Sequence, residues 1–496
     1  MSALASPDTI YALSSAAGRA GVAVFRVSGA DAKSAIEILA NIKNPKARHA
    51  YFSKLENQSG DLIDEALVLY FKGPNSFTGE DIAEFQVHGG RAVITALQAA
   101  LSALGCRLAE AGEFTRRAFE NGKLDLTQAE AIADLIDAET QMQRTQALKQ
   151  MGGALSQLTQ NWREKLLRIL AHLEADIDFP DEDLPAHITQ QRLKSLTDLS
   201  HEIDAHLSDN RRGERLRDGF SIAVLGAPNA GKSSLINALA QRDAAIVSAR
   251  AGTTRDIIEV HLDIAGYPII LADTAGLRET PDEIADEIEG EGIARALKRA
   301  QEADLTLVLF DAAQQPDAQS LALLNDKSFA VINKIDIARS IPLPLREGLG
   351  VGSVDIRNHG ENLSPSFQQD NLSSVFTNPT PNPSLKGRGI PSHPVYFIST
   401  RTGDGITQLL DALAARIKTM LADNHAAPLT RERHREALTH CQNHLTRAIT
   451  AYNASKPPEL VGEDIRLATR ALARITGAVD VDDILDIIFR EFCIGK

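Results

Sequence analysis

The residues from Gly226 to Ser233 have the types and spacing of a phosphate-binding loop. They read Gly-Ala-Pro-Asn-Ala-Gly-Lys-Ser, follow an apolar run at 221–225 and precede a predicted helix at 234–240. Glycines at these positions allow backbone N–H groups to turn toward phosphates at a helix N-terminus, Lys232 adds charge beside the β- and γ-phosphates, and the Ser233 hydroxyl can bind Mg²⁺. The pattern therefore predicts a nucleoside triphosphate site here rather than an ordinary glycine-rich turn.

Further short motifs stand at the ends of other predicted strands. The run Asp273-Thr274-Ala275-Gly276 follows the strand 269–272, and its carboxylate can hold the Mg²⁺ water shell while a flexible glycine N–H faces the γ-phosphate. Each such motif alone is more often a turn. Its position after a phosphate-binding loop and one strand favours a nucleotide role.

The purine is predicted by the last two motifs. Asn333-Lys334-Ile-Asp336 follows the strand 329–332, and Asp336 can accept two hydrogen bonds from guanine that adenine cannot donate. Ser399-Thr400-Arg401 ends the strand 395–398 and can supply contacts to the base. In this order the motifs predict a GTPase of the Ras-like class.

The sequence pattern alone does not identify the residue that orients the attacking water during GTP hydrolysis. Leu277 follows Gly276, and an apolar side chain cannot orient the attacking water as the glutamine of Ras does. The acidic stretch 282–291 contains the candidates, although its pattern alone favours a solvated helix face.

The elements around these motifs predict several domains. Strands at 22–27, 66–71 and 83–87 alternate with helices in the first hundred or so residues, which indicates a compact α+β domain. Helical periodicity runs from 127 to 207 and again from 430 to 492, on either side of an α/β segment. One helical domain with a doubly wound G domain inserted into it explains this pattern economically, and two separate bundles are the alternative. We place the domains at 1–120, 121–215, 216–420 and 421–496, with a disordered insertion at 338–394, because 342–394 holds eight of the 20 prolines and almost no periodicity.

Composition limits the compartment and the mode of nucleic-acid binding. The chain has 496 residues, of which 52 are basic and 66 acidic, so any contact with RNA has to be made by local basic patches. The segments 211–217 and 431–435 are candidates for such patches, although their pattern is slightly more typical of the solvated edges of helices. Three widely spaced cysteines fit a reducing cytoplasm, and we expect neither an export signal nor a membrane span.

Two further sites can be considered on the residues alone. Arg26 shares a strand face with Val22 and Val24 and needs a partner, and the residues alone favour an ion pair with Glu84. Cys493 is fourth from the end, but the last two residues do not fit a prenylation signal. It is either an incidental cysteine on a frayed tail or a mobile thiol near bound substrate.

A wider set of motifs resembles the MnmE (TrmE) family of tRNA wobble-uridine-modifying GTPases over nearly the whole chain. The motifs are Asp-Thr-Ile at 8–10, Gly-Arg-Ala-Gly-Val at 18–22, Arg-Val-Ser-Gly at 26–29, Gly-Pro-Asn-Ser-Phe-Thr-Gly-Glu-Asp at 73–81, His-Gly-Gly at 88–90, Gly-Glu-Phe at 112–114, Lys-Leu-Asp-Leu at 123–126, Gln-Ala-Glu-Ala-Ile-Ala-Asp-Leu-Ile-Asp at 128–137, Asp-Phe-Pro-Asp at 178–181 and Phe-Cys-Ile-Gly-Lys at 492–496.

The resemblance implies roles in the G domain. Asn229 and Thr253 would bind K⁺ with backbone oxygens of Ser248 and Arg250, Thr254 would join Ser233 on Mg²⁺, and Glu289, with Glu287 as a rival, would orient water. Such a K⁺ would replace an arginine finger, so that G domains pair across the nucleotide. With Lys232 as a catalytic residue, the implied GTP-binding set is Asn229, Ala230, Gly231, Lys232, Ser233, Ser234, Ser248, Thr253, Thr254, Asp273, Thr274, Ala275, Gly276, Asn333, Lys334, Asp336, Ser399, Thr400 and Arg401.

The resemblance also implies the reaction and its partners. A 5-formyl or methylene tetrahydrofolate would bind near Arg26, Glu84, Lys123 and Lys496, and Cys493 would be catalytic. A homodimer would act with an FAD-dependent partner, MnmG, in a heterotetrameric or larger complex, to add aminomethyl or carboxymethylaminomethyl groups to C5 of the wobble uridine of tRNA. The rival hypotheses are a ribosome-assembly GTPase that modifies nothing and a one-carbon transferase that acts on a small molecule.

Overall fold

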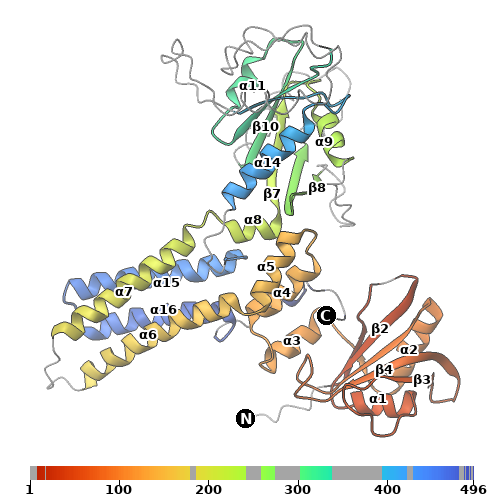
Figure 1. Ribbon diagram of the computed structural model, residues 1–496. Coiled ribbons are helices and arrows are strands. Elements are labelled where there is room, and N and C mark those ends of the chain that lie inside the picture. Colours follow the sequence, from red (N-terminus) through yellow and green to blue (C-terminus); the bar gives the residue numbers. More distant parts are fainter. Residues whose placement is uncertain are drawn as a thin grey trace, which may run out of the picture. The chain divides into compact units, whose positions relative to one another are not determined.

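The fold is described from a computed structural model (Figure 1). It describes residues 8–16, 18–178, 186–241, 259–273, 302–337, 394–421 and 428–479, together with 485, 488–490, 492 and 495. The chain divides into one compact unit of Met1–Ala138, Arg144–Arg211 and His425–Lys496 and another of Glu139–Gln143 and Arg212–Asn424. Among the described residues, each helix is too short or too polar to span a bilayer.

The N-terminal domain is built on a six-stranded sheet with the order β3-β4-β5-β2-β1-β6. The strands are β1 (Ile10–Leu13), β2 (Ala20–Ser28), β3 (Tyr51–Glu56), β4 (Leu62–Phe71), β5 (Ile82–Gly89) and β6 (Arg107–Leu108), with β6 parallel to β1 and the other neighbours antiparallel. Helices α1 (Ala32–Leu39) and α2 (Arg91–Ala103) share the core with one face of this sheet. The predicted α+β arrangement is confirmed.

The two faces of β2 have different surroundings. Ala23, Phe25 and Val27 are buried in the core under α1 and α2, whereas Val22 is 56% exposed and shares its face with Arg26. Arg26 therefore shares its face with Val22 and Val24, as predicted, but the core under the helices is made by the alternate residues of the strand. Arg26 instead lies on the second face, where Phe77 and Phe114 join a small cluster with Ile10 and Ala12.

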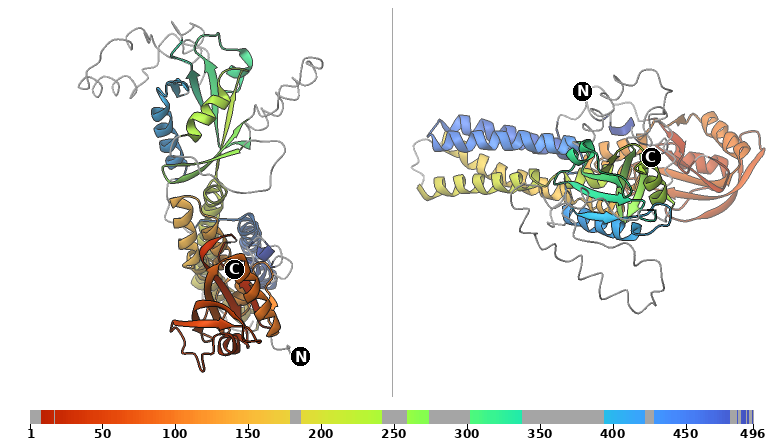
Figure 2. Two further views of the ribbon diagram at one scale, coloured as in Figure 1. Left: turned by 90° about the vertical axis from the view of Figure 1, so that its right-hand side faces the viewer. Right: turned by 90° about the horizontal axis from the view of Figure 1, so that it is seen from above.

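The helices on both sides of the inserted segment pack into one core. The helices are α3 (Glu113–Glu120), α4 (Leu126–Ile136), α5 (Gln141–Met151), α6 (Ala154–Asp178), α7 (Ala186–Leu207), α15 (Glu432–Asn453) and α16 (Pro458–Thr476). Helix α15 packs against α7 and α16, and α16 also packs against α6 (Figure 2). Trp162, Leu196 and Leu438, from both stretches of sequence, are buried in the same cluster. This packing supports a single helical domain rather than two separate bundles.

The described residues near the C-terminus pack against α4 and the N-terminal domain. Phe489 and Phe492 form a cluster with Leu126 and Ala129 of α4. A Cβ on Gly112, which precedes α3 in a left-handed conformation, would come within 2.5 Å of the carbonyl oxygen of Phe489. Ser14, just after β1, donates its hydroxyl hydrogen to the carbonyl oxygen of Gly495 at 3.0 Å.

The inserted segment forms a second six-stranded sheet in the order β12-β11-β10-β7-β9-β8. The strands are β7 (Phe220–Gly226), β8 (Glu259–Ile264), β9 (Tyr267–Asp273), β10 (Leu305–Asp311), β11 (Ser328–Asn333) and β12 (Val395–Phe397), preceded by α8 (Arg212–Asp218). Helices α9 (Lys232–Ala240) and α14 (Ile406–Met420) share one apolar cluster with the sheet, and residues in and just after α11 (Ala318–Ala322) pack against another.

One strand departs from the parallel pattern. Strand β8 is antiparallel to β9, while the other neighbouring pairs of this sheet are parallel. The hairpin turns at Ala265 and Gly266, both with positive φ, and the Gly266 N–H donates to Asp263 at 2.6 Å. Except for Pro394, the predicted insertion at 338–394 lies outside the described residues, and the domain boundaries stay predictions.

Candidate functional site

The phosphate-binding loop runs from the end of β7 into α9, as the sequence predicts. Gly226 and Gly231 both have positive φ, and Gly231 is the N-cap residue of α9. A Cβ at Gly226 would collide with the carbonyl oxygen of Leu309, and one at Gly231 would collide with the Asn333 side chain. Glycine is therefore needed at both ends of the loop for conformation and for space.

Polar groups are concentrated at the start of α9. The Lys232 ammonium donates to the carbonyl oxygens of Gly226 and Ala227, both at 2.9 Å, which holds it over the loop. Ser233 and Ser234 occupy the first turn of α9, Ala230 is buried, and Asn229 has a left-handed φ of 63°. Exposed N–H groups at a helix start, with a lysine folded over them, can bind phosphate.

Asn333 connects two of the predicted motifs. Its side-chain amide donates to the carbonyl oxygen of Ala230 at 3.0 Å, and its side-chain oxygen accepts from the Thr400 N–H at 3.1 Å. Asn333 is buried in this arrangement, with 1% of the residue exposed. Asn333 therefore fixes the phosphate loop to the loop that carries Ser399, Thr400 and Arg401.

Asp336 is held in place by that same loop. Its carboxylate accepts from the Ser399 hydroxyl at 2.7 Å and lies 3.3 Å from Nε of Arg401, whose side chain is 79% exposed. Lys334 pairs with Asp311 at 2.7 Å. The structure thus brings together Asn333, Asp336 and Ser399 near the phosphate loop, as a guanine site requires.

Of the motif that begins at Asp273, the structure describes only this first residue, which is the last residue of β9. The predicted site residues outside the described part of the chain are Ser248, Arg250, Thr253, Thr254, Thr274, Ala275, Gly276, Glu287, Glu289, Cys493 and Lys496.

A second candidate site lies on the Arg26 face of the N-terminal sheet. A cavity of about 560 Å³ is lined by Arg26, Arg48, Phe71, Asn75, Ser76, Phe77, Ile82, Glu84 and Lys123. It brings together Arg26, Glu84 and Lys123, three of the four residues predicted to bind folate. The volume lies within the roughly 300–1,000 Å³ typical of small-molecule pockets.

The expected Arg26–Glu84 ion pair is present in this cavity. Arg26 donates through Nη2 and Nε to one oxygen of Glu84 at 3.0 and 3.1 Å, across a directly paired position of β2 and β5. The guanidinium also lies 5.6 Å from the ring centre of Phe77 and 5.9 Å from that of Phe114. The pair and a ligand site are compatible, because both side chains remain partly exposed and line the cavity.

The charge of the cavity favours an anionic ligand. Arg26, Arg48 and Lys123 supply three cations against the single carboxylate of Glu84. Arg48 donates to the carbonyl oxygen of Asn75 at 2.8 Å and lies over the Phe71 ring, and no ion pair is found for Lys123 within the described residues. This excess of positive charge occurs in a chain with a net charge of −14.

Sequence reasoning missed most of the cavity wall. Asn75, Ser76 and Phe77 come from the motif at 73–81, which was used for the family resemblance but given no role. Arg48 lies in an irregular segment between α1 and β3, where no periodicity or motif marks it. Only the fold brings it to Phe71.

The arginines of the segment 431–435 are largely buried, so the prediction that this segment is a solvated helix edge was wrong. Arg433 makes a bidentate pair with the fully buried Glu130 at 2.5 and 2.6 Å, Arg431 pairs with Asp134 at 2.8 Å, and their side chains are 17% and 11% exposed. These arginines are held within the helical domain, which leaves them poorly placed to meet tRNA phosphates. In the other basic segment, Arg215 pairs with Asp304 at 2.8 Å.

Glu130 and His434 form the centre of this buried cluster. Burial would raise the pKa of Glu130, but the neighbouring cations outweigh it and hold that pKa well below its usual range. Burial, helped by Arg433 and Arg431, lowers the pKa of His434, which lies 3.0 Å from Glu130 through Nε2. His434 is therefore neutral and donates from Nε2 at neutral pH.

The two described cysteines are unsuited to nucleophilic catalysis. Burial raises the pKa of Cys106 to about 11 and that of Cys441 to about 12, so both remain thiols at neutral pH. Cys493, which is predicted to be catalytic, lies outside the described residues.

Comparisons with known proteins find similar domains and similar full-length chains. The family model described as the MnmE helical domain matches residues 126–493, and that described as the GTP-binding protein TrmE N-terminus matches residues 9–123. The chain is 48% identical over 491 residues to a protein named tRNA modification GTPase MnmE from Paramagnetospirillum magneticum, covering 99% of this chain and 100% of that protein. Proteins of the same name from Parvibaculum lavamentivorans and Rhodospirillum rubrum are 48% and 46% identical, with 99% of this chain covered and 100% and 99% of theirs.

Proposed function

This chain belongs to the MnmE family of tRNA modification GTPases, and from that premise we propose its full reaction. It is a GTP hydrolase that requires K⁺ and acts in the cytoplasm as a homodimer with the FAD-dependent protein MnmG. Together they add an aminomethyl or carboxymethylaminomethyl group to C5 of the wobble uridine in tRNA. A 5-formyl or methylene tetrahydrofolate supplies the one-carbon unit.

The observation that carries the proposal is the cavity of the N-terminal domain. A reduced folate has a flat pterin with N–H donors, an apolar middle and a tail of carboxylates. Glu84 can accept from the pterin, the rings of Phe71 and Phe77 can contact flat groups, and Arg48 and Lys123 can pair with the carboxylates. Lys496 would add a further cation.

The G domain would supply GTP binding and hydrolysis. Lys232 and the N–H groups at the start of α9 bind the phosphates, while Asp336 accepts hydrogen bonds from guanine. Ser233 and Thr254 would hold Mg²⁺, and Asn229 and Thr253, with the backbone of Ser248 and Arg250, would hold K⁺. When bound, these cations would neutralise charge on the phosphates. Glu289 or Glu287 would orient the attacking water.

The C-terminal segment would bring a thiol to the reaction. Phe489, Phe492 and Gly495 are anchored to α3, α4 and the end of β1, and Cys493 stands between them in the sequence. We assign Cys493 a catalytic role next to the folate, and GTP hydrolysis would rearrange the site through movement of the G domains.

Equilibrium dialysis of 5-formyltetrahydrofolate against the full chain tests the cavity. Glu84→Gln keeps the size of the side chain but removes the charged acceptor, worth about 1.5–3 kcal/mol, so affinity should fall about 10- to 100-fold. Glu65→Gln, on the exposed side of β4, is the matched control and should bind like the wild type. Equal affinity of the two variants, or no binding by the wild type, would remove folate from the proposal.

A further inference from the structure

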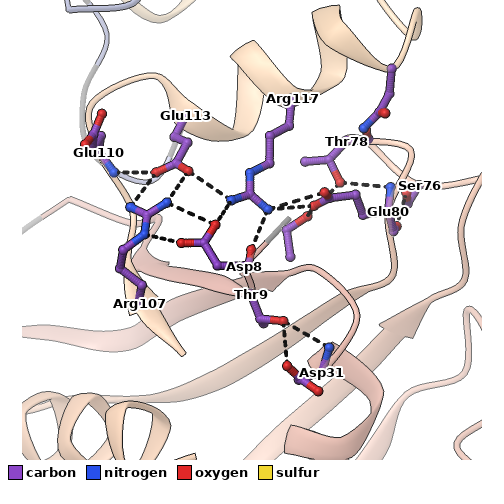
Figure 3. A network of polar contacts seen from close by, with 12 residues as sticks. Asp8, Thr9, Asp31, Ser76, Thr78, Glu80, Arg107, Glu110, Glu113 and Arg117 are labelled. Atoms are coloured by element: carbon purple, nitrogen blue, oxygen red, sulfur yellow. Dashed lines mark hydrogen bonds and ion pairs between the residues drawn. The ribbon is translucent and has the colours of Figure 1, made fainter. Parts of the chain in front are cut away.

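One wall of the cavity is a loop that is fixed from behind. The wall loop, residues 73–81, presents Asn75, Ser76 and Phe77 to the cavity. Thr78 and Glu80 belong instead to a network of polar contacts that reaches α3 and the residues before β1 (Figure 3). The position of the cavity wall therefore depends on side chains that do not line the cavity.

Arg117 of α3 is at the centre of this network and is 8% exposed in its side chain. Its Nη1 donates to both oxygens of Glu80, at 3.2 and 3.3 Å, and to the carbonyl oxygen of Asp8 at 2.8 Å. Its Nη2 donates to Asp8 and Glu113, both at 3.0 Å. One guanidinium thus joins the wall loop, α3 and the chain before β1.

Glu80 passes this restraint to the rest of the wall loop. Its carboxylate accepts from the Ser28 hydroxyl of β2 at 2.7 Å, and its carbonyl oxygen accepts from the Ser76 hydroxyl at 2.5 Å. Thr78 shares a 2.7 Å hydrogen bond with Ser28, and the Asn121 side chain donates to the Thr78 carbonyl oxygen at 2.8 Å. These contacts fix the loop on both sides of Phe77.

The charges make the arrangement specific. Burial alone would lower the pKa of Arg117, but Glu80 and Glu113 outweigh it and raise that pKa, so the guanidinium stays charged. The planar guanidinium of Arg117 bonds three carboxylates and a carbonyl oxygen at once, which the single ammonium of lysine cannot do. Replacing Arg117 by lysine keeps the charge but loses the geometry that holds Glu80.

We infer that Arg117 is a positioning residue for the cavity ligand: acting through Glu80, it holds the wall loop so that Asn75, Ser76 and Phe77 line the site. The inference rests on the proposed function for the identity of the ligand. The N-terminal end of α3 also contacts Phe489, so the same helix is fixed to the C-terminal segment that carries Cys493. The wall loop and the C-terminal segment are thereby both attached to α3, the helix that carries Arg117.

The first test compares two lysine variants on the same helix. Arg117→Lys should weaken 5-formyltetrahydrofolate binding by the full chain at least tenfold. Arg116→Lys is the matched control, because Arg116 pairs with Glu120 on the outer side of α3, and its affinity should stay within twofold of the wild type. Binding by a folded Arg117→Lys variant at wild-type affinity would overturn the inference.

A double-mutant cycle separates positioning from general destabilisation. If Arg117 acts through the loop, then Phe77→Ala alone should weaken binding, and Arg117→Lys should have less than a threefold effect in the Phe77→Ala background. If instead the loss of affinity in the double variant equals the product of the losses in the two single variants, Arg117 does not act through the loop, and the inference is contradicted.

Hydrogen exchange of the protein without ligand distinguishes the two proposals. Arg117→Lys should speed exchange of the amides at 75–79 at least tenfold relative to Arg116→Lys, while the amides of α16 are unchanged. If the wild type fails to bind folate and this change is still seen, the proposed ligand is wrong and the positioning role stands. Unchanged exchange at 75–79 would overturn the positioning role whatever the ligand.

Discussion

Glu130→Gln should strongly destabilise the helical domain while changing no volume. The Glu130 side chain is fully buried in α4 and accepts two hydrogen bonds from Arg433 and one from His434. Arg433 also donates to the carbonyl oxygens of Arg474 and Ile475 at the end of α16. A glutamine at this position would leave Arg433 without its counter-charge. Its side-chain NH₂ group would also face the N–H donors of Arg433 and His434 instead of accepting from them.

The magnitude follows from the burial. Removing one partner of a buried ion pair typically costs about 3–5 kcal/mol, because the remaining charge is left uncompensated. An exposed pair contributes about 0–1 kcal/mol. Glu463→Gln is therefore the matched control, since Glu463 is 59% exposed and pairs with Arg466 on α16 of the same domain.

Fluorescence of Trp162 during urea unfolding measures this directly. It is the single tryptophan of the chain, and it is buried in the core of the helical domain. With a slope near 2 kcal/mol per M urea, a loss of about 4 kcal/mol lowers the midpoint by about 2 M. Glu463→Gln should shift it by less than about 0.5 M. A Glu130→Gln midpoint within the range of the control would refute the assignment of a paired, ionised Glu130.

Three further predictions concern separate parts of the molecule. Because the folded state lowers the pKa of His434, the imidazole takes up a proton in the unfolded chain at a higher pH than in the folded protein. The free energy of unfolding should therefore fall as pH drops from about 7 toward the pKa of the folded state. His434→Gln, which retains a donor to Glu130, should make this pH dependence weaker in urea titrations at several pH values. Gly231→Ala should abolish GTP binding in a fluorescent-nucleotide assay, since its Cβ would collide with Asn333, and wild-type affinity would contradict the crowding seen there. Arg48→Gln should weaken 5-formyltetrahydrofolate binding about tenfold, through loss of a charged hydrogen bond, with little change in GTP affinity; equal losses for both ligands would point to misfolding.

The G domain illustrates what the sequence determines well. The motif from Gly226 to Ser233 marks its own strand, loop and helix, because the glycines, lysine and serine are needed at fixed spacing by the phosphate chemistry. Apolar runs likewise predict β7, β10 and β11, which the structure confirms. The direction of β8 was not marked, since a short hairpin turn rather than the strand's own composition makes it antiparallel.

The cavity and the buried cluster show where prediction from sequence ends. Arg26 and Glu84 could be paired from their types, but which face of β2 packs under the helices could not be predicted, because both faces carry apolar residues. Arg433 and Glu130 lie 303 residues apart, and nothing local in either helix indicates that a charged run at 431–435 will be buried. Such contacts depend on how distant helices pack, which one sequence does not reveal.

The central claim is best tested by mass spectrometry of nucleosides from the bulk tRNA of a strain that lacks this gene. The strain is complemented with the wild type, Lys232→Ala or Cys493→Ser. The account predicts that uridines with C5-aminomethyl-type groups disappear from the deletion strain and return only with the wild type, which would also exclude an assembly GTPase and a transferase confined to small molecules. Normal levels of these uridines in the deletion strain, or full restoration by both variants, would contradict it.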